Sequence, residues 1–191
     1  MENNNLIHNN FKKININGTN NKYQMKKLLE KNITKEKKQR VDAKKWSFSK
    51  DYYDHENQVK IIIDISNNSF THIDDITKIA LQQINKKIYS YKQQDIIKKH
   101  FNEEKFLTLE HVIKQLNDCE LKCKYCNKEM YILYDVVREM SQWSIDRINN
   151  DMGHNNDNFH LSCLECNLKR RRINDEKFLF TKKLTIIKQD A

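Results

Sequence analysis

The chain has 191 residues, enough for one modest domain with extensions, and it carries 35 lysine and arginine residues against 26 aspartate and glutamate residues. The net charge of +9 favours a polyanionic partner, and nucleic acid is the commonest one. The sequence contains no run of about 18 apolar residues, which argues against a membrane span, and its polar N-terminus argues against a signal peptide. We therefore expect an intracellular protein that is not secreted and whose paired cysteines are metal ligands rather than disulfides.

Residues 1–45 are rich in asparagine and lysine and show no sustained hydrophobic periodicity. Such a segment buries too little apolar surface to offset the entropy that is lost on ordering it. We therefore expect a disordered basic arm. Its sequence leaves two interpretations open, a contact with nucleic acid and a tail without function.

Residues 46–118 contain apolar patterns but no motif that indicates a function. The β-branched run at residues 59–65 predicts a buried strand. The rest of this region has apolar residues at helical spacing, and its role is not readable. We expect a mostly helical region, with helical patterns at residues 73–91, 96–101 and 108–116.

Residues 119–191 have a different pattern of apolar residues, because short segments replace the long stretches with helical spacing. A cysteine pair, a strand-like segment, a polar loop and a second strand-like segment at residues 159–163 follow one another. The loop contains Gly153, one of only two glycines, where a turn with positive φ is expected. One helix is expected to begin near Cys166 and another after Asn174. The fold class is therefore α+β, with a mostly helical N-terminal part followed by two strands and a helix.

Four of the five cysteines occur as two identical pairs, Cys123-Lys-Tyr-Cys126 and Cys163-Leu-Glu-Cys166. Each C-x-x-C turn places two thiolates within reach of one tetrahedral ion, and Zn²⁺ suits four sulfur ligands. Four cysteines leave no open coordination position, so we expect a structural zinc ion that contributes folding free energy to a region with a thin core. The fifth cysteine, Cys119, is expected to be a spare thiol, although it could replace Cys123 at a longer spacing.

Several polar elements occur in a fixed order between and after the cysteine pairs. They are Trp143-Ser-Ile-Asp-Arg-Ile-Asn-Asn, then Gly153-His154, then Asp157-Asn158, and then Asn167 directly after Cys166. This order resembles the HNH endonucleases, and more narrowly their zinc-stapled group with an Asp-Arg-Ile-Asp signature, which is common in phages and large DNA viruses. The resemblance covers residues 123–172. It implies a ββα-metal finger, in which two strands, a polar loop and a helix enclose one divalent cation, and a place of action on viral or host DNA in an infected cell.

The resemblance also assigns roles to individual residues. It implies that Asp146 and Asn167 ligate a catalytic Mg²⁺ or Mn²⁺ ion, and that Asn158 braces the loop by hydrogen bonds. A carboxylate oxygen and an amide oxygen are the hard ligands that these ions prefer. Two protein ligands leave coordination positions for water and for a phosphate oxygen, as hydrolysis of a phosphodiester requires.

Two positions depart from the family pattern. Arg147 stands where most members have a histidine that acts as general base, and a guanidinium cannot accept a proton at neutral pH. Arg147 could instead grip the scissile phosphate through two hydrogen bonds. His154 and His160 are then the candidate bases, and ionisation of water without a protein base is the third possibility. Asn149 replaces the second aspartate of the signature, which removes one carboxylate.

A run of four cations, Lys169, Arg170, Arg171 and Arg172, follows the expected start of the helix. They point to several sides, so two or three of them are expected to reach DNA phosphates, and a solvated face is the alternative. The leading prediction is a metal-dependent HNH-type DNA endonuclease with DNA as its partner, no membrane and no organic cofactor. Two other functions stay open, a catalytically weakened HNH-fold DNA-binding module and a zinc-ribbon-like interaction protein.

Overall fold

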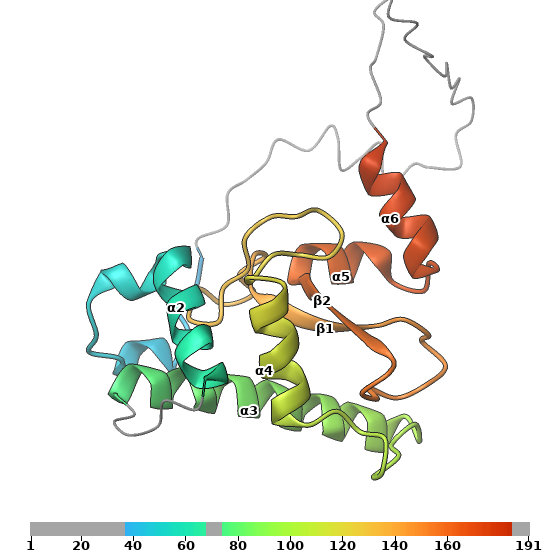
Figure 1. The fold of residues 1–191 in the computed structure, drawn as a ribbon, viewed down its shortest axis with the longest axis horizontal. Coiled ribbons are helices and arrows are strands. Elements are labelled where there is room, and N and C mark those ends of the chain that lie inside the picture. The colour runs from blue at the N-terminus through green and yellow to red at the C-terminus, as the bar shows by residue number, and fades with distance from the viewer. Residues whose placement is uncertain (1–36, 68–73, 185–191) are drawn as a thin grey trace, which may run out of the picture. The chain divides into compact units, whose positions relative to one another are not determined.

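The computed structural model describes residues 37–67 and 74–184, and residues 37–183 form one compact unit (Figure 1). The unit is mixed α/β, with five α-helices and one two-stranded antiparallel sheet. Residues 1–36 of the arm expected at residues 1–45 lie outside the described residues. Residues 37–45 belong to the compact unit, where Ala43 is buried and the Arg40 guanidinium donates to the carbonyl of Tyr134 at 3.0 Å. The elements in chain order are η2 (Ala43–Lys45), η3 (Lys50–Tyr53), α2 (His55–Ser66), α3 (Asp75–Ile97), α4 (Leu109–Asp118), β1 (Trp143–Arg147), β2 (Phe159–Cys163), α5 (Leu164–Arg170) and α6 (Asp175–Lys183).

The strand predicted at residues 59–65 is wrong, because these residues lie in the helix α2. The buried positions of α2 are Gln58, Ile61, Ile62 and Ile65, which is the spacing of one helical face. The first buried position holds the polar residue Gln58. The apolar residues of the segment are therefore concentrated in residues 59–65, a β-branched run that is typical of a strand. The burial of this helical face against the rest of the fold outweighs the β propensity of isoleucine.

The buried Gln58 side chain is satisfied by the backbone of a distant segment. Its Oε1 accepts hydrogen bonds from the N–H groups of Ile132 and Leu133, at 2.7 and 3.0 Å, and its Nε2 donates to the carbonyl of Leu133 at 3.0 Å. A buried polar group is tolerated only when it is bonded in this way. Gln58 therefore ties α2 to the segment that leads into β1.

The predicted helices at residues 73–91 and 108–116 are confirmed as α3 and α4. The first begins behind Asp74, whose carboxylate accepts from the N–H of Thr77 at 2.8 Å, and the second begins behind Thr108 in a capping box. The helix predicted over residues 96–101 is only the end of α3, which stops at Ile97. Among the described helices, none has both the length and the apolar character that crossing a membrane requires.

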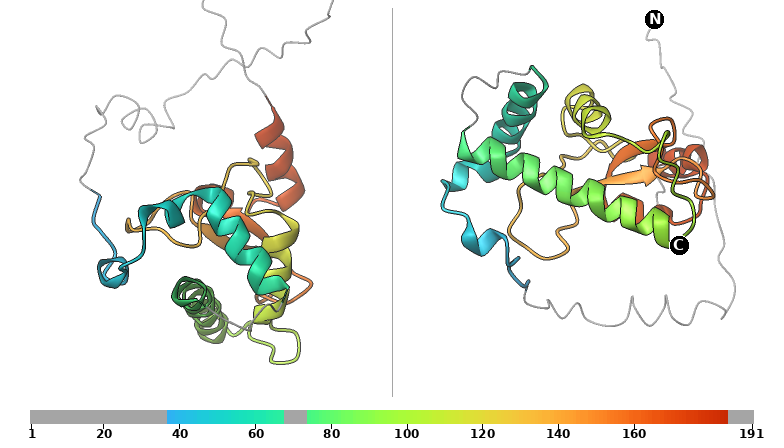
Figure 2. Two further views of the ribbon diagram at one scale, coloured as in Figure 1. Left: turned by 60° about the vertical axis from the view of Figure 1, so that its left-hand side comes forward. Right: turned by 90° about the horizontal axis from the view of Figure 1, so that it is seen from below.

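The strands β1 and β2 pair so that Asp146 lies opposite His160 and Ile145 lies opposite Leu161. The helix α5 follows β2 directly and packs against both strands. Figures 1 and 2 show α3 running along the other side of this sheet. The strand–loop–strand–helix order predicted for this part of the chain is confirmed, with the helix beginning at Leu164, two residues before the predicted Cys166.

The edge of β1 that faces away from β2 is closed by side chains of α3 and α5. The Tyr91 hydroxyl accepts a hydrogen bond from the N–H of Ile145 at 3.1 Å, and the Asn167 amide donates to the carbonyl of Ile145 at 3.0 Å. Lys87 donates to the carbonyl of Trp143 in the same manner. These contacts satisfy backbone groups that an open sheet edge leaves unpaired.

Candidate functional site

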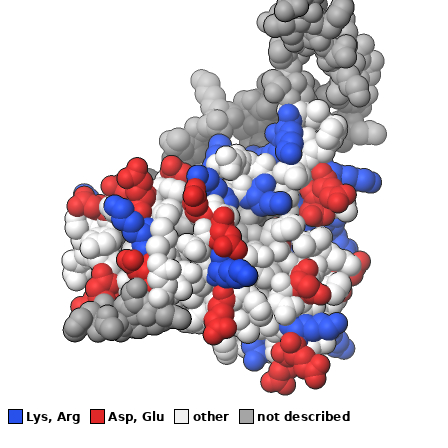
Figure 3. Space-filling view, in the orientation of Figure 1, with Lys and Arg blue, Asp and Glu red and all other residues white. Residues whose placement is uncertain are grey.

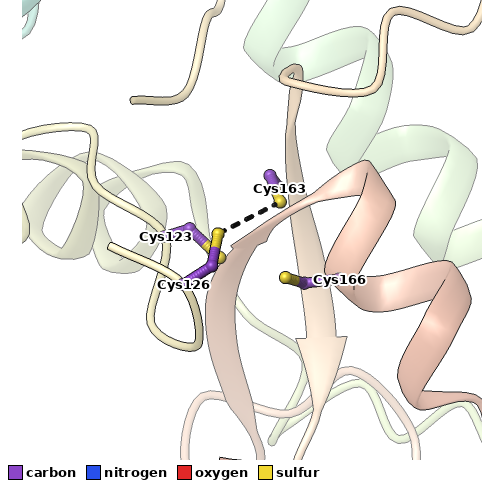
Figure 4. Close-up of side chains that lie close together, drawn as sticks. All are labelled: Cys123, Cys126, Cys163 and Cys166. Carbon is purple, nitrogen blue, oxygen red and sulfur yellow. Dashed lines mark hydrogen bonds between the residues drawn. The ribbon is translucent and has the colours of Figure 1, made fainter. Parts of the chain in front are cut away.

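Four cysteine side chains from two segments of the chain, residues 123–126 and 163–166, meet at one point (Figure 4). All four sulfur atoms lie within 4.8 Å of one another, and the Sγ atoms of Cys126 and Cys163 are 3.8 Å apart. A tetrahedral ion with Zn–S bonds of about 2.3 Å separates its sulfur ligands by about 3.8 Å. The predicted cluster of Cys123, Cys126, Cys163 and Cys166 is therefore confirmed as a group that can hold a structural metal ion.

The fifth cysteine is not part of this cluster. Cys119 ends α4, and its thiol donates to the carbonyl of Leu116 at 3.6 Å. Burial raises the pKa of the Cys119 thiol, which favours the neutral form. The residue is a half-buried thiol, as expected for the spare cysteine.

A cavity of about 660 Å³ lies beside β1, with walls from α3, α5 and the loop between the strands. Six of the residues that the sequence singled out line this cavity. Their side chains include one carboxylate, one amide, one imidazole and three guanidinium groups. They are Asp146, Arg147, His154, Asn167, Arg171 and Arg172.

The carboxylate of Asp146 is buried and held from two sides. Its Oδ2 accepts hydrogen bonds from the Tyr125 hydroxyl at 2.7 Å and from Nε of Arg170 at 2.6 Å. Burial raises the pKa of Asp146, and these two contacts oppose the rise. Tyr125 lies inside the first C-x-x-C turn, so the cysteine cluster also brings a hydroxyl donor to Asp146.

Arg170 was expected on a surface that faces DNA, but the structure places it in the interior. It is completely buried, and besides Asp146 it contacts the carbonyl of Arg147 at the free edge of β1. The reason is its position on α5, where Arg170 falls three residues after Asn167, on the face that packs against the sheet. Arg170 therefore holds α5 on β1, and it is not a surface contact for a ligand.

The other three cations of the run are exposed. Arg171 and Arg172 line the cavity, and Arg172 lies 3.5 Å from a carboxylate oxygen of Asp151. Lys169 forms an ion pair with Glu165 one turn earlier on α5. The basic run thus divides into one buried cation, one paired surface cation and two cations at the cavity.

Asn167 reaches β1 from the first turns of α5. Its Nδ2 donates to the carbonyl of Ile145 at 3.0 Å and to the Ser144 hydroxyl at 3.2 Å. Because both amide hydrogens face the strand, the Oδ1 atom is the part of the amide that remains as a possible ligand. Asn167 and Asp146 line the same cavity, so the structure brings together two oxygen-bearing side chains that are 21 positions apart in the sequence.

The two candidate histidines lie in different surroundings. His154 lines the cavity, and its Nδ1 lies 2.7 Å from a carboxylate oxygen of Asp95. His160 does not line this cavity; its Nε2 lies 3.4 Å from Asp175, beside a separate small hollow. Burial lowers the pKa of both histidines. Of the two candidates, His154 is therefore the one that shares a cavity with Asp146; His100, which follows α3, also lines this cavity.

Asn158 joins the two sides of the loop between the strands. Its Nδ2 donates to the carbonyls of Asn149 and Gly153, at 3.0 and 2.9 Å, and its Oδ1 accepts from the N–H of Asn149 at 2.8 Å. The side chain is buried, so each of these bonds is shielded from water. The Asn158 amide therefore braces the loop that carries His154.

Replacing Asn158 by alanine is expected to lower the free energy of unfolding by about 2 to 3 kcal/mol, because it removes three hydrogen bonds and leaves the buried carbonyl of Gly153 without this partner. Urea unfolding followed by circular dichroism measures the change. Asn156→Ala is the matched control, since Asn156 is exposed in the same loop. Equal midpoints for the two variants would contradict a bracing role for Asn158.

Sequence reasoning missed the contribution of α3 to the cavity. Tyr91 and Gln94 of this helix line the cavity, as does Lys98 directly after it, and Asp95 contacts the imidazole of His154. One signal was available, because Asp95 continues the helical spacing of the buried residues on α3 and so places a carboxylate where an apolar residue is expected. Tyr125 was missed as well, although an aromatic residue inside a cysteine knuckle is close to any site that the knuckle supports.

No protein-family model matches this chain, and no curated protein or solved structure shows significant similarity to it.

Proposed function

We propose that the chain is a metal-dependent DNA endonuclease of the HNH type, which hydrolyses phosphodiester bonds. The observation that carries this proposal is the shared cavity of Asp146, Asn167 and His154, beside the guanidinium groups of Arg147 and Arg171. An oxygen ligand pair, an imidazole and phosphate-binding cations are the groups that metal-assisted hydrolysis of a phosphodiester needs. The order of two strands, a loop and a helix fits the finger that the sequence resemblance implies.

We further propose that the cysteine cluster holds Zn²⁺ in a structural role. The sulfur spacing fits a tetrahedral ion, and four thiolates leave no position for substrate. The ion would join the first cysteine turn, which carries Tyr125, to the junction of β2 and α5, which carries Asn167. It would thereby hold both side chains against β1.

The residues present also fit a divalent ion with oxygen ligands, Mg²⁺ or Mn²⁺. Asp146 and Asn167 would hold it, and within the described part of the chain the Oδ1 atom of each has no hydrogen-bond partner. The neighbouring Arg170 guanidinium weakens the attraction of the Asp146 carboxylate for a cation. When bound, such an ion stabilises the negative charge that develops on the phosphate and promotes ionisation of water.

The cations around the cavity are suited to hold the DNA backbone. Arg147 donates one hydrogen bond to the carbonyl of Met152, which leaves its other N–H groups for a phosphate. Arg171 and Arg172 are exposed, and they line the same cavity as Arg147 together with Lys98, the residue that follows α3. Acidic and basic side chains are interspersed on the face shown in Figure 3, and we assign DNA contact to the cations that line the cavity.

The proposal is tested by incubating the zinc-loaded full chain with supercoiled plasmid in the presence of Mg²⁺ or Mn²⁺. We expect nicked or linear product, loss of activity with EDTA, and binding that weakens steeply with salt because phosphate contacts release counterions. Binding without cleavage under all these conditions would favour the DNA-binding module, which is also consistent with Arg147 in place of the family histidine. Absence of salt-dependent DNA binding would contradict both the endonuclease and the DNA-binding module, and it would favour the zinc-ribbon-like interaction protein.

A further inference from the structure

The carboxylate of Asp95 is fully buried, and both of its oxygens contact the same residue. Oδ2 accepts from the backbone N–H of His154 at 2.6 Å, and Oδ1 lies 2.7 Å from the Nδ1 atom of its ring. Within the described residues, no lysine or arginine forms an ion pair with Asp95. In a neutral ring, an Nδ1–H that donates to this carboxylate leaves Nε2 of the same ring as an acceptor.

The position of His154 is set by α3 and by the segment after it. A Cβ atom on the preceding residue, Gly153, would lie 2.5 Å from the carbonyl oxygen of His100 and 2.9 Å from Oδ2 of Asp95. Only glycine allows the loop to approach the end of α3 so closely. The Tyr91 ring packs against the imidazole, with the ring centres 4.6 Å apart. The imidazole is therefore fixed in orientation as well as in tautomer.

The charged groups around the imidazole come from two elements. Asp95 belongs to α3 and Lys98 follows directly after this helix, and Arg147 belongs to β1. Burial lowers the pKa of His154, the two cations lower it further, and Asp95 raises it. The net shift of the pKa is downward, which favours the neutral ring that is able to accept a proton.

We propose that Asp95 is a positioning residue that fixes His154 as the general base of the hydrolysis. In this step Nε2 of His154 takes a proton from the attacking water as the water oxygen bonds to phosphorus. The bond from phosphorus to the leaving 3′ oxygen breaks, that oxygen takes a proton from solvent, and His154 returns its own proton to solvent. This inference rests on the proposed endonuclease function, and it gives the helical region before residue 119 a role in catalysis.

The test uses the zinc-loaded full chain and the variant Asp95→Asn, which keeps an oxygen for the backbone N–H of His154 but removes the charge that orders the ring. We expect plasmid nicking to be roughly 10²-fold slower, since a misplaced general base loses most of its effect. We also expect its pH–rate profile to lose the limb that reports ionisation of His154. Asp64→Asn is the matched control, because Asp64 is an exposed carboxylate on α2, and it should nick at the parent rate.

Two further measurements keep the proposal falsifiable if Asp95→Asn does not fold. In His154→Ala, which leaves α3 unchanged, added imidazole should restore part of the lost nicking. Nitrogen-15 chemical shifts of His154, measured without DNA, should show a protonated Nδ1 and an unprotonated Nε2 in the parent protein.

The outcomes separate this inference from the proposed function. A parent protein that nicks, together with Asp95→Asn at the parent rate and pH profile, would overturn the role of Asp95 while the endonuclease survives. Nicking that is lost in His160→Ala but not in His154→Ala would overturn the choice of base. A parent protein that never nicks would overturn the proposed function itself.

Discussion

Replacing Asp146 by asparagine is expected to abolish plasmid nicking while leaving the fold in place. The asparagine oxygen still accepts hydrogen bonds from Tyr125 and Arg170, but the charge that attracts a divalent ion is gone. Loss of several kcal/mol of transition-state stabilisation corresponds to a decrease of roughly 10³-fold in rate. The measurement is the initial rate of plasmid nicking at saturating Mg²⁺, with thermal unfolding of each variant beside it.

The control for this change is Asp157→Asn, which alters an exposed carboxylate in the loop between the strands. It is expected to nick at nearly the parent rate. Asp146→Ala is a poorer variant, because it removes the hydrogen-bond acceptor of the buried Arg170 guanidinium as well as the charge, whereas Asp146→Asn keeps the acceptor. The alanine variant is expected to destabilise the fold by about 3 to 5 kcal/mol. If Asp146→Asn nicked as fast as Asp157→Asn, Asp146 would not be a ligand of the catalytic ion.

Removing the metal from the cysteine cluster is expected to unfold the part of the chain that contains β1, β2 and α5. A structural zinc site contributes on the order of 10 kcal/mol of apparent binding free energy, which becomes folding free energy when the site exists only in the folded chain. Cys163→Ser should therefore lose both bound zinc and a cooperative thermal transition. Zinc content by a colorimetric chelator and thermal unfolding by circular dichroism measure the two effects.

Cys119→Ser supplies the matched comparison, since it changes a cysteine that lies outside the cluster. It should keep one zinc ion per chain and a melting temperature close to that of the parent. A Cys163→Ser protein with the parent's zinc content and melting temperature would show that the four sulfur atoms do not bind a metal. Something other than a metal ion would then have to hold Tyr125 and Asn167 against β1.

The features that could be predicted from the sequence are those set by short spacing. The two C-x-x-C turns, the strand–loop–strand order and the helices with regular apolar spacing all depend on residues close together in the chain. The strand predicted in place of α2 failed because Gln58 is polar yet buried, and its partners at Ile132 and Leu133 lie more than seventy positions away. No local pattern reports such a partner.

The same limit applies to the candidate site. Asp146 and Asn167 could be proposed from a motif, but the contact of Asp95 with His154 spans 59 positions and depends on how α3 docks against the loop. In the sequence, Arg170 cannot be distinguished from the three surface cations next to it. Its burial follows from its position on the inner face of α5, three residues after Asn167, which requires the exact start of that helix.

The most direct test of the shared ion site is a Mn²⁺ titration followed by electron paramagnetic resonance, with the cysteine cluster already loaded with zinc. The parent protein and the Asp157→Asn control are expected to bind one Mn²⁺ ion with the same affinity. Asp146→Asn and Asn167→Ala are each expected to weaken that binding by at least about tenfold, since each removes one of two protein ligands. Equal Mn²⁺ affinity in all four proteins would contradict a site built from Asp146 and Asn167.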